Sequence, residues 1–127
     1  MKVLNLIIKQ KYFDAILAGR KVQEFREIRP TTEKKYIQLD SEGYAIEDEY
    51  GNCVPVKYDA IRFFVGYEKD RDTALVEVVG AHTELFVDDN NQPIKYDYKG
   101  EEYYAEQIVY DLGKIIEHNI RDKSKKV

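Results

Sequence analysis

The 127-residue sequence has little of the chemistry that disulfides and metal sites need. Cys53 is its one cysteine, so there is no second thiol for an intrachain disulfide and no thiolate cluster for zinc. The two histidines, His82 and His118, stand apart from any second ligand pattern. We therefore predict no metal site, no cofactor and no Cys–His nucleophile.

Long hydrophobic runs are also missing. No apolar stretch approaches the roughly 20 residues that a membrane-spanning helix needs. Lys2, Lys9 and Lys11 interrupt the start of the chain too early for a signal peptide. No internal repeat, linker or long low-complexity segment is present. These absences predict a cytoplasmic protein with no membrane partner.

The remaining composition favours a compact globular protein. Of the 127 residues, 43% are hydrophobic and 35% are charged, which allows one buried core and leaves little room for a second. We therefore predict a single domain over residues 1–127. The C-terminus is rich in lysine, and it predicts that residues 120–127 form a frayed, solvated tail.

Charge is unevenly distributed along the chain. Residues 1–35 contain 9 Lys/Arg and 4 Asp/Glu, residues 36–113 contain 6 and 18, and residues 114–127 contain 5 and 2, for a net charge of −4. A negative total argues against strong non-specific binding to nucleic acid. A small basic cleft built from the first third of the chain is compatible with these numbers, because local charges determine the field in a cleft.

Hydrophobic spacing predicts a strand, a helix and a second strand within the first 28 residues. Residues 3–8 are β-branched or leucine-rich, which is typical of a short buried strand. Residues 11–18 follow a helical period, and Gly19 can end that helix in a left-handed conformation. Pro30 then ends the second strand, because proline withholds a ladder donor. Three side chains of the helix are expected to be buried: Phe13, Ile16 and Leu17.

Further strands are predicted where apolar runs lie between turn residues. Residues 60–65 and 74–79 give the strongest patterns, and residues 36–39 and 44–46 predict shorter strands. Residues 101–119 fit both a helical and a strand pattern, so their structure stays open. Turns are expected at three polar segments: residues 40–43, 49–52 and 88–93.

The second predicted strand carries many charges for a core element. Side chains alternate across a strand, so Glu24 and Arg26 share one face with the apolar Ile28. If this face turns inward, Glu24 and Arg26 turn inward with it. Partly buried charges must be paired or must line a cleft. One alternative is an ion pair of Glu24 with Arg26 or Lys21 that has no further role.

Residues 13–21 (FDAILAGRK), together with residues 24–26 (EFR), resemble the signature of the ASCH domain family, small β-barrels related to the PUA RNA-binding domains. The likeness extends more weakly to residues 60–67, 74–80 and 109–116, so that it covers most of the chain. It implies an α+β fold, a small PUA-like β-barrel with one or two helices on its rim. It also favours a strand over residues 109–116.

The resemblance implies a module that binds RNA or a modified nucleoside in a charged cleft. Within the family, a lysine at the position of Lys21, followed three residues later by a threonine, looks like part of the active site of small amidohydrolases that remove the acetyl group from acetylated cytidine. Lys21 and Glu24 are therefore the candidate catalytic residues. This chain has Glu24 where the relatives have the threonine, and a carboxylate cannot donate as a hydroxyl does. A nearby carboxylate also favours the charged lysine, which works against a lysine base.

Basic and aromatic residues near this segment are the candidate ligand contacts. Lys9, Arg26 and Arg29 offer donors to phosphate, and Tyr12 and Tyr67 offer rings on which a base can stack. The predicted partner is thus RNA, a nucleoside or a nucleotide. Two alternatives stay open. One is an amidohydrolase that acts on an acylated nucleoside such as acetylated cytidine, and the other is a regulatory or protein-interaction barrel without nucleotide.

Overall fold

The computed structural model describes residues 1–121, in which seven strands and two short helices form. The predicted α+β class is confirmed. Residues 122–127, which make up most of the predicted tail, lie outside the described residues. No helix in the described part of the chain is both long and apolar enough to cross a bilayer.

The described residues group into two compact units, each built from segments that are distant in the sequence. The first unit contains residues 1–23, residues 58–80 and the chain from residue 111 onward, and the second contains residues 24–57 and 81–110. The long strands β4 (Thr73–Leu85) and β7 (Glu106–Asn119) contribute residues to both units. The prediction of one domain over the whole chain stays a prediction.

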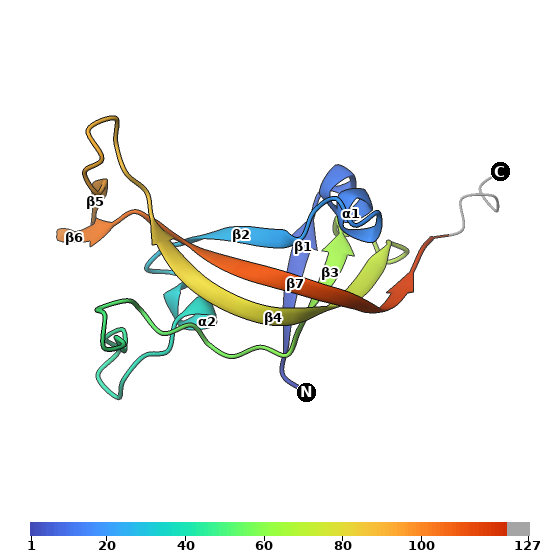
Figure 1. Cartoon of the computed structure of the whole chain (residues 1–127), viewed down its shortest axis with the longest axis horizontal. Helices are drawn as coiled ribbons and strands as arrows, with labels where there is room; N and C mark the ends of the chain where they lie inside the picture. The colour runs from blue at the N-terminus through green and yellow to red at the C-terminus, as the bar shows by residue number, and fades with distance from the viewer. Residues whose placement is uncertain (122–127) are drawn as a thin grey trace. The chain divides into compact units, whose positions relative to one another are not determined.

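The first unit is built on β1 (Val3–Ile8) and β3 (Ala60–Val65), which lie side by side as parallel strands (Figure 1). Both strands begin and end at the predicted residues. Strand β3 also pairs antiparallel with β4, whose first residues cover the predicted strand at 74–79. The buried side chains of these strands form the core of the unit: Leu4, Leu6, Ile8, Ala60, Ile61, Phe63, Ala74, Leu75 and Val76.

Helix α1 (Gln10–Leu17) packs against β3 and confirms the predicted helix to within one residue at each end. Phe13 and Ile16 are buried, with 1% and 5% of their surface exposed. The prediction that Leu17 is also buried was wrong, because its side chain is half-exposed. Successive helical residues point about 100° apart, so Leu17 lies at the margin of the face that Ile16 centres.

Two glycines of the first unit have identifiable roles. Gly19 has a φ of +77°, which confirms the left-handed helix end predicted at this residue. Gly113 of β7 permits a close approach, because a Cβ at this position would overlap the carboxylate of Glu77 and lie 2.8 Å from a methyl carbon of Val79. Backbone conformation therefore favours glycine at position 19, and the lack of space for a side chain favours glycine at position 113.

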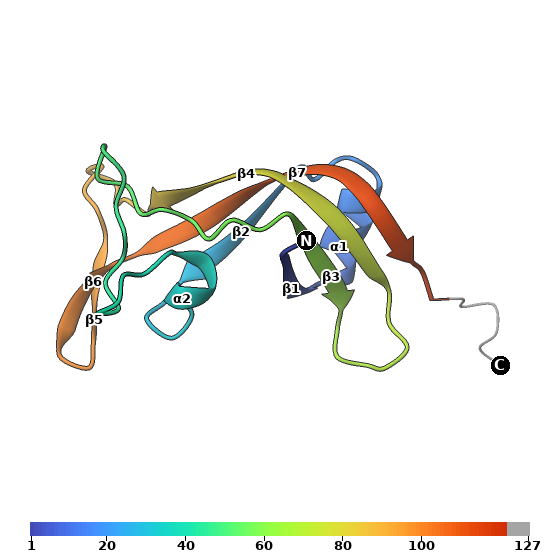
Figure 2. The ribbon, with the colours of Figure 1, turned by 90° about the horizontal axis from the view of Figure 1, so that it is seen from below.

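The second unit contains most of β2 (Gln23–Ile28), the one-turn helix α2 (Glu33–Tyr36) and a hairpin of β5 (Lys95–Tyr98) and β6 (Glu101–Tyr104), drawn in orange in Figure 2. The predicted strand at 36–39 was wrong, because Tyr36 ends α2. Residues 37–55 form isolated bridges in place of regular strands: Ile37 with Pro55, Leu39 with Ala45, and Glu47 with Cys53.

An aspartate closes each of the turns predicted in the second unit. The Asp40 carboxylate accepts hydrogen bonds from the amides of Glu42 and Tyr44, at 2.8 and 3.0 Å. Asp48 and Asp88 repeat this pattern with the amides two and four residues further on. Aspartate favours such turns because its short side chain can bond its own backbone two residues later.

The main sheet is open. Its strands pair in the order β1-β3-β4-β7-β2, and β5 and β6 form a separate two-stranded sheet. The predicted barrel was wrong in this respect, because closure requires the first and last strands of the order to pair, and among the described residues β1 and β2 end the order without closing it. Residues 109–116 lie in β7, which confirms the strand that the resemblance favoured.

Candidate functional site

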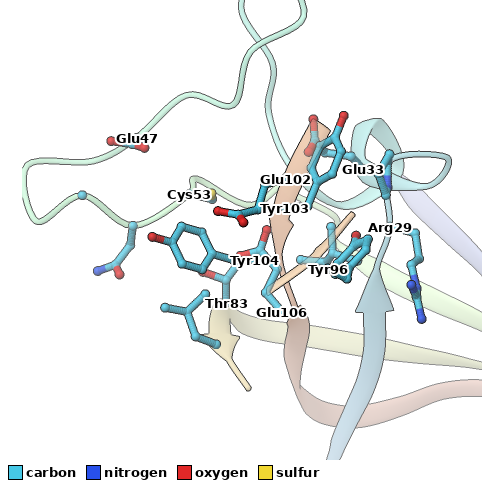
Figure 3. A pocket seen from close by; sticks show the side chains of 15 residues that line it. Arg29, Glu33, Glu47, Cys53, Thr83, Tyr96, Glu102, Tyr103, Tyr104 and Glu106 are labelled. Atoms are coloured by element: carbon cyan, nitrogen blue, oxygen red, sulfur yellow. The ribbon is translucent and has the colours of Figure 1, made fainter. Parts of the chain in front are cut away.

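A pocket of about 330 Å³ lies within the second unit. We call it the tyrosine pocket, because it is lined by Tyr96, Tyr103 and Tyr104 of the β5–β6 hairpin (Figure 3). Its volume lies at the lower end of the range for small-molecule sites, about 300 to 1,000 Å³. The other lining residues are Ile28, Arg29, Pro30, Glu33, Glu47, Gly51, Asn52, Cys53, Thr83, Leu85, Glu102 and Glu106.

The hairpin arranges its aromatic rings through its register. Tyr96 lies opposite Tyr103 across the two strands, and their rings stack with centroids 5.9 Å apart and planes 25° from parallel. Tyr98 meets Tyr103 edge-on at 6.3 Å. Tyr104 remains 50% exposed. Rings held in this way offer a preformed surface on which a planar ligand can stack.

Carboxylates already neutralise the cations around the tyrosine pocket. The Arg29 guanidinium lies beside Tyr96, 5.0 Å from the ring centroid (Figure 3), and 2.7 Å from a carboxylate oxygen of Glu27. Lys95 lies 5.1 Å from the ring centroid of Tyr104 and 3.3 Å from a carboxylate oxygen of Glu102. Four glutamates and one arginine line the pocket, so its charge is negative.

Two of the lining glutamates, Glu33 and Glu106, are partly buried. Burial raises the pKa of each carboxyl above its ordinary value, and the charge of Glu33 raises the pKa of Glu106 further. A protonated carboxyl donates a hydrogen bond, whereas an ionised carboxylate only accepts. The two carboxylates can therefore accept hydrogen bonds from a donor on a ligand.

The thiol of Cys53 is chemically quiet. Burial, followed by the charge of Glu106 and of other nearby carboxylates, raises the pKa of Cys53 to about 11. The thiolate is the nucleophilic form of cysteine. Cys53 thus stays protonated at neutral pH and acts as part of the pocket wall.

Glu106→Gln is expected to raise the free energy of unfolding at neutral pH by up to about 1 kcal/mol, a small effect because solvent screens a half-exposed carboxylate. The pKa of Glu106 is raised in the folded state, so its protonation favours folding. The contribution of Glu106 to stability is therefore fully present below the unfolded pKa and is lost as the pH rises through the folded pKa.

The advantage of Glu106→Gln should therefore shrink as the pH is lowered to about 3, below the ordinary glutamate pKa of about 4.3, where the wild-type carboxyl is largely protonated in both states. Denaturant titrations at the two pH values measure this change, and Glu49→Gln, at an exposed position, is the matched control. An equal gain at both pH values would contradict a desolvated carboxylate at position 106.

Four of the predicted site residues lie in the first unit: Lys9, Tyr12, Lys21 and Tyr67. Lys9 is exposed at the start of α1, and Tyr67 is 85% exposed. The ammonium groups of Lys11 and Lys21 lie 4.9 and 5.6 Å from the ring centroid of Tyr12. Within this unit, the structure thus brings the predicted Tyr12 and Lys21 together.

The other three, Glu24, Arg26 and Arg29, lie in the second unit. Glu24 and Ile28 are buried, so the face of β2 that carries these two side chains turns inward. The Nε of Arg26 lies 3.4 Å from a carboxylate oxygen of Glu24, which forms the ion pair that the sequence left open. Arg29 lies just beyond β2 and lines the tyrosine pocket.

The three lining tyrosines and the glutamate pair were not predicted as ligand contacts. One local signal, the Lys99–Gly100 pair, could have indicated the hairpin that carries the aromatic wall. Both residues have positive φ, 50° and 84°, as in a two-residue hairpin turn. Such a turn fixes the register that sets Tyr96 opposite Tyr103. The contribution of Glu33 and Glu106 depends on contacts between distant segments and has no local signal.

Fold and site together define an α+β protein with an open sheet and an acidic, tyrosine-lined pocket. Within residues 1–121, no group of three or more His, Cys, Asp or Glu side chains is placed to hold a metal ion. Comparison of the chain with protein-family models, curated proteins and solved structures finds no match. Membership of the ASCH family stays a prediction.

Proposed function

We propose that the protein binds a nucleoside, with the base in the tyrosine pocket. The observation that carries the proposal is the occurrence of aromatic rings and partly buried carboxyls in one pocket of suitable size. The tyrosine rings offer stacking to the planar base. Glu33 and Glu106 offer carboxylate acceptors to the exocyclic amino group of a base such as cytosine or adenine.

The charge of the pocket favours a nucleoside over a phosphate-bearing ligand. Four glutamates line the pocket against one arginine, and Arg29 is already paired with Glu27. Binding to nucleic acid depends largely on cations that neutralise phosphates. A phosphate group in this pocket would face mainly carboxylates, so we propose free nucleosides as the ligand class in preference to RNA.

The resemblance of residues 13–26 to ASCH domains supports the same ligand class, and a PUA-related origin of the fold is part of this proposal. We propose a binding module in preference to an amidohydrolase. The ion pair of Glu24 with Arg26 engages the carboxylate that would have to replace the relatives' threonine. Glu24 also has no hydroxyl to supply.

Calorimetric titration with cytidine, adenosine and uridine is expected to show binding of the first two and weaker binding of uridine, which lacks the amino group. Tyr103→Leu should weaken cytidine binding roughly tenfold, because base stacking on an aromatic side chain contributes about 1 to 3 kcal/mol. Tyr44→Leu is the matched control, since Tyr44 lies in the same unit, is 69% exposed and does not line the pocket.

Each other outcome identifies a different function. Tighter binding of cytidine monophosphate or of a short RNA than of cytidine would overturn the preference for a free nucleoside. Release of acetate from acetylated cytidine, lost in Lys21→Ala, would establish the amidohydrolase. Failure of every nucleoside to bind would leave the protein-interaction alternative as the better description.

A further inference from the structure

The negative charge of the tyrosine pocket is only partly compensated by the protein. Four glutamates and one arginine line the pocket. The arginine and one of the glutamates are engaged in the ion pairs described above. The other three glutamates, Glu33, Glu47 and Glu106, form no ion pair within residues 1–121. A ligand in the pocket therefore meets an excess of carboxylates.

The three carboxylates act on common neighbours inside the pocket. Burial, followed by the charges of Glu106, Glu47 and Glu33, raises the pKa of the Cys53 thiol. Burial also raises the pKa of Glu106, and the charge of Glu33 raises it further. A nearby positive charge has the opposite effect on a carboxyl, because it favours the ionised form. A cationic ligand would thus stabilise these carboxylates, whereas a neutral ligand would only take more water from them.

The aromatic rings of the pocket also attract cations. The Arg29 guanidinium and the Lys95 ammonium lie 5.0 and 5.1 Å from the ring centroids of Tyr96 and Tyr104. A cation within about 6 Å of a ring centroid is attracted to the negative face of the ring. Tyr103 lies between the same two residues in the pocket wall, and its ring stacks on Tyr96 (Figure 3). A positively charged planar base that stacks on these rings would gain the same attraction.

A neutral cytosine base fits such a pocket only in part. Its amino group can donate to a carboxylate, but the ring nitrogen beside the amino group carries a lone pair and accepts. The ionised forms of Glu33 and Glu106 also only accept, so a lone pair that faces them gains no hydrogen bond. A methyl group or a proton on this ring nitrogen removes the lone pair and gives the base a positive charge.

We propose that the tyrosine pocket selects a nucleoside whose base carries a positive charge, of the kind that methylation of a ring nitrogen produces. This ligand class is narrower than the nucleosides proposed above, and it depends on that proposed function. The charged base stacks on the tyrosine rings beside Glu33 and Glu106, and its amino group donates to a carboxylate. The pocket volume corresponds to about eleven water molecules in the liquid, which suits a pyrimidine base with one added methyl group.

Calorimetric titration of the full chain with cytidine, 3-methylcytidine and 5-methylcytidine tests the proposal. The two methylated compounds have the same size, but only 3-methylcytidine carries a positive charge at neutral pH. We expect it to bind roughly tenfold more tightly than 5-methylcytidine. Glu106→Gln should reduce this ratio severalfold, because it removes a negative charge and nearly keeps the shape. Glu49→Gln is the matched control, at an exposed glutamate of the same unit outside the pocket lining, and it should leave the ratio unchanged.

The outcomes separate this proposal from the proposed function. If cytidine binds and 3-methylcytidine binds no more tightly than 5-methylcytidine, charge selection is wrong and nucleoside binding is established. If none of the three compounds binds, both proposals are wrong. An equal ratio in Glu106→Gln and Glu49→Gln would also overturn charge selection by the carboxylates. Denaturant titration of each variant shows whether it is folded.

Discussion

Phe13→Ala is expected to lower the free energy of unfolding by about 3 to 5 kcal/mol, as for other truncations of buried aromatic side chains. Phe13 is 1% exposed and belongs to the buried face of α1, the helix that packs against β3. The substitution removes apolar surface from the core and leaves a cavity that the neighbouring strands fill only in part. Denaturant titration of the wild type and the variant measures the loss.

Two further substitutions in α1 test which face is buried. Ile16→Ala should cost about 2 to 5 kcal/mol, since Ile16 is 5% exposed. Leu17→Ala is the matched comparison, and it should cost clearly less because the side chain is half-exposed. Equal losses at positions 16 and 17, or a loss below about 1 kcal/mol for Phe13→Ala, would show that the helix packs through a different face.

Asp72→Ala is expected to lower the free energy of unfolding by about 1 to 3 kcal/mol, because it leaves the backbone amide of Arg121 without its acceptor and removes one of the two acceptors of the Gln10 side chain. Asp72 is 6% exposed. One carboxylate oxygen accepts from the amide of Arg121 at 2.6 Å, and the other accepts from the side-chain amide of Gln10 at 3.1 Å. This carboxylate therefore connects the start of α1 to the chain beyond β7.

Asp70→Ala is the control for Asp72→Ala, because Asp70 lies in the same loop and is exposed. Thermal and chemical denaturation of the two variants should separate them clearly. Similar stability of both variants would mean that the buried carboxylate of Asp72 contributes no more than a surface charge.

Local sequence patterns were sufficient to predict two strands, the end of the first helix and the residues that share one face of β2. The strands at 3–8 and 60–65 are short apolar runs between polar residues, and hydrophobicity alone indicates such runs. Gly19 carries its own signal, because a left-handed helix end selects glycine. Alternation along β2 also correctly placed Glu24 and Ile28 on one face.

Features that depend on pairing between distant segments were not predictable in the same way. The tyrosine pocket combines Arg29, Cys53, Tyr103 and Glu106, and no spacing in the sequence indicates that these residues meet. Whether a sheet closes depends on hydrogen bonds between its first and last strands, and alternation within one strand does not report on these bonds. Asp72 was likewise indistinguishable from a turn residue, because its acceptor role depends on Gln10 and Arg121.

The three aspartate-closed turns also bear on how long an exposed loop survives in the presence of proteases. Residues 36–56 contain no lysine or arginine, so trypsin-like enzymes find no cleavage site there. Enzymes that cut after glutamate find targets such as Glu42 and Glu49, but cleavage requires the local segment to open. The Asp40 carboxylate holds the amide of Glu42 itself, and the Asp48 carboxylate holds the amide of Tyr50, which follows Glu49. We therefore expect these side chains to slow digestion of the exposed loops, as regular secondary structure does elsewhere.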